Sequence, residues 1–130
     1  MEDSILNDVK KLLGIPSDVD DFDKDIIMCI NTVFFEVNQM GVGPSKCFSI
    51  KDNTSKWSDF SDRFDMEGFK TYMHLKVKMQ FDPPANSQLA ESYNNRIKEL
   101  EFRIHSLWDR YMNSDVKSIK EWIESNKKEV

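Results

Sequence analysis

The chain has 130 residues, of which 39% are hydrophobic and 32% charged, and its formal net charge is −5. This length and composition predict one domain with a buried core and exclude a disordered tail. Lys and Arg are dispersed and form no long basic run, which argues against a protein that binds nucleic acid by neutralising phosphates. A basic patch assembled in three dimensions stays open.

The cysteines and the longest apolar run bear on the compartment. Cys29 and Cys47 lack CxxC spacing and no signal peptide is visible, so a reducing compartment with free thiols is expected. A Cys29–Cys47 disulfide is the minor alternative. The longest apolar run is too short to cross a bilayer, so no membrane segment is predicted.

Two amphipathic helices are predicted in the first forty residues. Ser4 is a candidate N-cap for the first, and Gly14 ends it. Its apolar face is predicted to carry Ile5, Leu6, Val9, Leu12 and Leu13. The second is predicted from about residue 22 to 40, because apolar residues recur in steps of four and three. Its predicted core residues are Ile26, Ile30, Val33, Phe34 and Val37.

The middle of the chain is less regular. Residues 41–56 are predicted to be an irregular loop or a short β segment, since 47–50 alternate in polarity. A short helical turn follows at 56–63, with Trp57 and Phe60 facing inward. Residues 66–81 fit both a strand and a helix, but their length and their Met, Leu and Lys content favour a helix. A strand is the alternative for 70–81.

The last part of the chain begins at a proline corner. Pro83 and Pro84 force extended backbone, after which Asn86 or Ser87 is expected to cap a long helix. Its heptad seam is predicted to pack within the same domain, with a coiled-coil dimer as the alternative. The predicted core residues of this seam are Ile97, Leu100, Ile104 and Leu107.

A break at 113–115 is expected to end this helix, and Ser114 to cap a last short one. The prediction is therefore an all-α bundle of four to five helices over 1–113, followed by a helical tail over 114–130. The tail places Ile119, Trp122 and Ile123 among Lys and Glu. It is either a partner-docking segment or a helix folded back on the bundle.

The residues needed for catalysis or metal binding do not form recognisable motifs. His74 and His105 are isolated in the sequence, and Glu99 and Glu101 are two residues apart and do not share a helix face. The acidic stretch 17–21 lacks the central Gly and the closing Glu of a calcium loop. We therefore predict no enzyme, no cofactor and no metal.

Seven motifs occur in a characteristic order: Ile5–Gly14, Phe22–Asn31, Gln39–Pro44, Trp57–Phe60, Lys70–Tyr72, Phe81–Pro84, and Glu99–Glu101 with Arg103. In this order the sequence resembles the small head–tail connector (adaptor, or head-completion) proteins of tailed bacteriophages and prophages of Gram-positive hosts. The resemblance covers roughly residues 4 to 112. Gly-Val-Gly-Pro at 41–44 and Phe-Asp-Pro-Pro at 81–84 are its most specific elements.

The resemblance implies a subunit of a homo-oligomeric ring, commonly a dodecamer, beneath the portal of a DNA-filled head. Such a ring, in the neck of a virion made in the host cytoplasm, extends the DNA channel. It also binds the next neck or tail protein, a stopper or tail terminator. The resemblance further implies that the tail, with Ile119, Trp122 and Ile123, docks on the portal.

A ring needs two different lateral faces, and the loop residues Val42, Pro44, Phe48 and Ile50 are candidates for one of them. The acidic balance suits a lumen that is acidic or neutral and lets DNA slide without sequence-specific binding.

Two other classes of protein are weighed against this one. A helical regulatory or DNA-binding protein needs a recognition helix, and residues 56–64 offer only Lys56 and Arg63. The other alternative is a free helical homodimer that associates through the long helix after residue 87.

Overall fold

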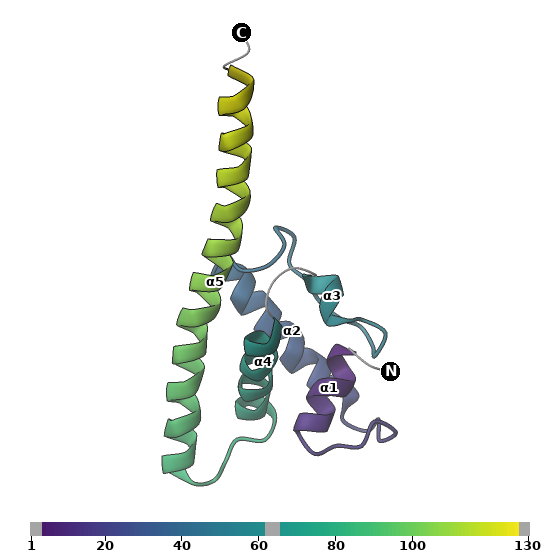
Figure 1. Cartoon of the computed structure of the whole chain (residues 1–130). Coiled ribbons are helices and arrows are strands. Elements are labelled where there is room, and N and C mark those ends of the chain that lie inside the picture. Colours follow the sequence, from purple (N-terminus) through teal and green to yellow (C-terminus); the bar gives the residue numbers. More distant parts are fainter. Residues whose placement is uncertain (1–3, 62–65, 128–130) are drawn as a thin grey trace.

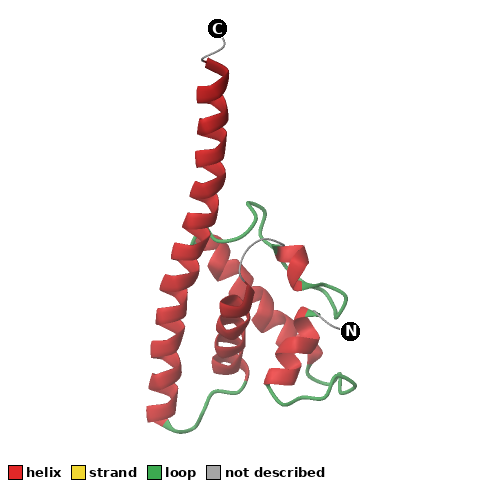
Figure 2. Cartoon of the chain, in the orientation of Figure 1, coloured by secondary structure: helices red, strands yellow, loops and turns green. Residues whose placement is uncertain are grey.

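The computed structural model describes residues 4–61 and 66–127, and side chains over 4–61 and 67–110. Over these ranges the chain forms helices joined by loops, with no β-sheet (Figure 1; Figure 2). The predicted all-α class is confirmed. The helices are α1 (Ile5–Leu12), α2 (Asp23–Gln39), α3 (Trp57–Phe60), α4 (Met66–Phe81) and α5 (Ser87–Lys127).

Helix α1 begins at the predicted cap. Ser4 is extended, and its hydroxyl accepts a hydrogen bond from the Asn7 amide at 3.3 Å and donates to the Asn53 carbonyl at 2.8 Å. The Ile5 amide donates to the Ser55 carbonyl at 3.0 Å. The first turn of α1 is therefore capped and also tied to the end of the irregular loop.

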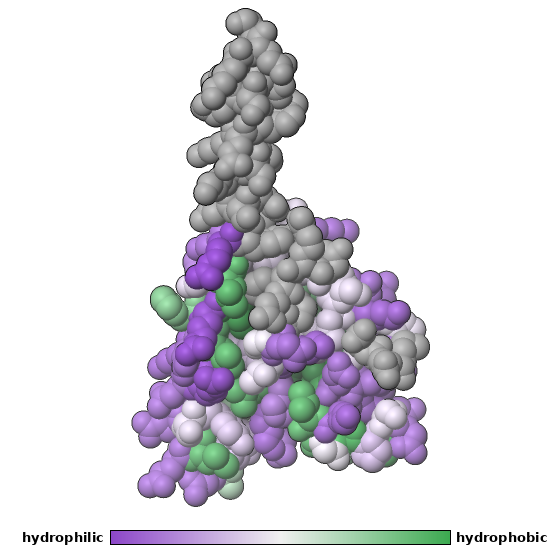
Figure 3. Space-filling model, in the orientation of Figure 1, coloured by the Kyte–Doolittle hydropathy of each residue, from purple (hydrophilic) through white to green (hydrophobic). Residues whose placement is uncertain are grey.

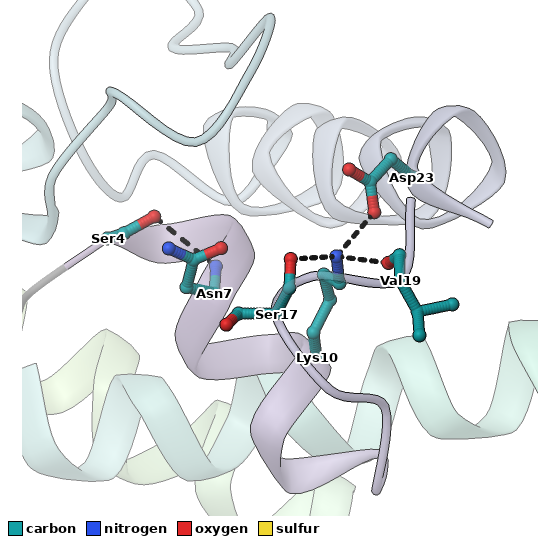
Figure 4. Close-up of polar contacts among 6 residues, drawn as sticks. All are labelled: Ser4, Asn7, Lys10, Ser17, Val19 and Asp23. Atoms are coloured by element: carbon teal, nitrogen blue, oxygen red, sulfur yellow. Dashed lines mark hydrogen bonds and ion pairs between the residues drawn. The ribbon is translucent and has the colours of Figure 1, made fainter. Parts of the chain in front are cut away.

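A buried lysine connects α1 to the start of α2 (Figure 4). The Lys10 ammonium donates to the Ser17 carbonyl at 3.2 Å and the Val19 carbonyl at 2.6 Å, and it pairs with the Asp23 carboxylate at 2.8 Å. All three of its protons have an acceptor, which permits a side chain that is only 1% exposed. Leu12, predicted on the apolar face, is instead 53% exposed.

Helix α4 lies at the centre of the body and packs against α1, α2 and α5 (Figure 1). Residues 66–81 are thus helical, and the strand alternative is wrong. A helix with neighbours on three sides is apolar around most of its circumference, which weakens the helical period in its sequence. The side chains of α4 that are buried are Phe69, Tyr72, Met73, Leu75 and Val77.

An aromatic cluster joins α2, α3 and α4. The ring centroid of Phe34 lies 5.1 Å from that of Phe60 and 4.9 Å from that of Phe48. Phe60 is in turn 4.9 Å from Phe69. Trp57 is buried, and its indole N–H donates to the Asp8 carboxylate at 2.8 Å. Trp57 and Phe60 face inward as predicted, so the single turn of α3 fixes the irregular loop on the core.

The irregular loop 41–56 contains no strand, so the short β segment considered for 47–50 is wrong. Its only β-type pairing is the isolated bridge between Ser4 and Lys56. The Ile50 backbone pairs with a side chain instead. The Asn31 amide donates to the Ile50 carbonyl at 2.9 Å and accepts from the Ile50 N–H at 2.8 Å. Because Asn31 satisfies both groups, Ile50 enters the core without a partner strand.

The buried stripe of α5 departs from the predicted heptads at its C-terminal end, near residues 107 and 108. Ile97, Leu100 and Ile104 are buried, but Leu107 is 36% exposed and Trp108 takes its place with 9%. A straight helix has 3.6 residues per turn and drifts from a seven-residue repeat of 3.5 per turn. About three turns after Ile97, the side of α5 that faces the rest of the protein has therefore shifted by one residue, from position 107 to position 108.

Helix α5 also continues without the predicted break at 113–115, so Ser114 is not an N-cap. Asn, Ser and Asp have low helix propensity, but each costs only a fraction of a kcal/mol within an established helix. The 41 residues of α5 correspond to about 60 Å of helix at about 1.5 Å per residue, and its C-terminal half projects beyond the body (Figure 1).

One side-chain hydrogen bond joins α4 to α5 and leads to a prediction about how stability depends on pH. The buried Tyr72 hydroxyl donates to the Glu101 carboxylate at 3.0 Å. Burial and the Glu101 charge raise the pKa of Tyr72 well above its usual value of 10. Tyr72→Phe is expected to lower the free energy of unfolding by about 1.5 kcal/mol at pH 8.

Because the folded pKa is raised, this contribution is complete below about pH 10, the unfolded value, and is lost as pH rises further. The difference between wild type and Tyr72→Phe in urea unfolding should therefore shrink between pH 8 and pH 11. A difference that stays constant over this interval contradicts the prediction.

Candidate interaction surfaces

Several large apolar side chains of the described residues stay in contact with solvent. Figure 3 shows apolar residues along the side of the body where α5 packs, between stretches of hydrophilic surface. Isolated exposed apolar residues are common in soluble proteins, but residues that share a helix face are candidates for a contact surface. The exposed large apolar residues are Leu12, Phe22, Met28, Phe35, Leu89, Phe102 and Leu107.

The outer face of α2 carries two of them on one stripe. Met28 is 70% exposed and Phe35 56% exposed, and they lie two helical turns apart. Between them runs a shallow groove of about 500 Å³, whose lining also includes Ile27 and Thr32. Ile26 and Val33 on the opposite stripe are fully buried. Helix α2 is therefore apolar on both sides, and only its inner side has a partner within the described chain.

The outer face of α5 carries the most exposed of these residues. Phe102 is 75% exposed and lies midway between the buried residues Leu100 and Ile104, on the opposite side of the helix. Its neighbours one turn away are Lys98 and His105, and His105 lies 3.4 Å from Asp109. This face therefore presents a single aromatic ring surrounded by charged and polar groups.

The loop residues predicted to contact a neighbouring subunit divide into two sets. Val42 is 1% exposed and Ile50 2% exposed, so both belong to the subunit's own core and do not offer side chains to a neighbour. Phe48 is partly buried in the aromatic cluster. Pro44 is exposed, and its carbonyl accepts a hydrogen bond from the Asn38 side chain at 3.2 Å. The alternating pattern of 47–50 thus marks core contacts.

The predicted portal-docking residues belong to the projecting half of α5. The α5 backbone continues through positions 114–127. The side chains of Ile119, Trp122 and Ile123 lie outside the described part of the structure. The helix that carries them extends past the α4 contact (Figure 1), so the backbone is placed where it can reach another protein.

Met28, Phe35 and Phe102 were not singled out from the sequence, although a signal exists. Each lies two residues from positions of the buried stripe on its own helix, and so on the face that should be polar. A large apolar residue in that register is a mark of a contact surface. Lys10 is the opposite case, a charged residue on the apolar side of its helix. It lies one turn from Leu6 and one turn from Leu13.

Burial shifts the pKa values of two chemically reactive side chains among the described residues, Cys29 and His74. Burial, followed by the Asp25 charge, raises the pKa of Cys29, and neither Cys29 nor Cys47 is in a disulfide. Burial and the nearby Lys78 lower the pKa of His74, whose Nδ1 is buried. No group of three or more His, Cys, Asp or Glu among the described residues is arranged to hold a metal ion.

Two other classes of protein each require a particular helix: a DNA-binding protein needs a recognition helix, and a membrane protein needs a helix that spans the bilayer. Within the described part of 56–64, which ends at residue 61, the chain forms the single turn α3, in which Trp57 and Phe60 are buried. Over the described ranges, none of the helices combines the length and hydrophobicity needed to span a membrane.

Apolar residues exposed on α1, α2 and α5, together with the projecting C-terminal half of α5, define a small all-α protein with surfaces suited to contacts with other chains. The sequence profile of the phage connector protein family matches residues 5–111. The chain belongs to this family, which gives it a head–tail connector role and a place in the neck of the virion. No curated protein and no solved structure matches it.

Proposed function

We propose that the protein forms a ring, commonly a dodecamer, that joins the portal of the DNA-filled head to the tail and extends the DNA channel. The observation that carries this proposal is membership of the connector family over residues 5–111. Exposed apolar residues on two different helices support it, because a closed ring needs two unlike lateral faces. The family is one of structural proteins, and the proposal includes no catalytic step.

The ring presents two ends to other proteins. One binds the portal and the other the next neck or tail component, a stopper or tail terminator. DNA passes through the lumen, and the formal charge of −5 supports a lumen that is acidic or neutral. A ring structure with a Lys- and Arg-lined channel would contradict this part of the proposal.

The experiment that tests the proposal is co-purification of the tagged protein with the portal protein encoded near its gene, followed by electron microscopy. The expected result is a ring capping the portal, and its image fixes the copy number. A small species that does not bind the portal would reject the portal part of the proposal and favour the free helical homodimer.

The projecting end of α5 is proposed to dock on the portal through Ile119, Trp122 and Ile123. Trp122→Ala is expected to weaken portal binding by about 2 kcal/mol or more, about 30-fold, since buried aromatic anchors dominate protein interfaces. Lys120→Ala on the same segment is the matched control and should change binding little. Affinity is measured by surface-immobilised portal. Unchanged binding for Trp122→Ala, or for a chain without 114–130, contradicts the prediction.

A further inference from the structure

We draw no further inference here: the strongest candidate, the shallow apolar groove on the outer face of α2 between Met28 and Phe35, carries none because nothing in the described part of the chain shows what covers it.

Discussion

Replacing Gly43 with alanine is expected to lower the free energy of unfolding by about 3 kcal/mol. Two independent costs add at this position. Its φ of +97° lies in the region that residues with a Cβ rarely adopt, and a Cβ would stand 2.7 Å from Cε1 of Phe60. Phe60 is held between Phe34 and Phe69, so its ring has little room to move.

Gly41 is the matched control for this prediction. Its φ is +83°, close to that of Gly43, but no atom lies within 4 Å of the Cβ it would acquire. Gly41→Ala should therefore cost only the conformational strain, about 1 kcal/mol. Urea unfolding followed by circular dichroism measures both variants. Equal losses would show that the contact with Phe60 is relieved at no cost.

Replacing Lys10 with methionine is expected to cost about 3 kcal/mol of stability, because it leaves buried acceptors without their donor. The Ser17 and Val19 carbonyls lose a hydrogen bond and the Asp23 carboxylate loses its counter-charge. The Asp23 side chain is 27% exposed and regains some hydration, which places the expected loss at the lower end for a broken buried pair.

Lys11 is exposed and provides the control for Lys10. Lys11→Met should change the free energy of unfolding by less than about 0.5 kcal/mol, as surface substitutions usually do. Thermal and urea unfolding of the two variants, with the wild type alongside, measure the difference. If Lys10→Met unfolds like Lys11→Met, the three contacts of the ammonium contribute nothing to stability and the prediction is wrong.

Local signals in the sequence predicted most of the helices, although not the unbroken course of α5 through 113–115. Periodic apolar residues predicted α2, the Ser4 hydroxyl predicted the start of α1, and Pro83 with Pro84 predicted the corner before α5. These features depend on backbone angles and on neighbours one turn apart, and both can be read from a short stretch of chain. The order of the family motifs added the connector role, which the match over residues 5–111 supports.

Other features depended on which helix lies next to which. Trp108 takes the place of Leu107 because α5 runs straight along α4, and Ile50 is buried because Asn31 satisfies its backbone groups. Met28 and Phe35 are the exposed side of α2 because α4 covers the opposite side of that helix. Such features arise from contacts between residues far apart in the sequence, so periodicity within one segment predicts helices but not their neighbours.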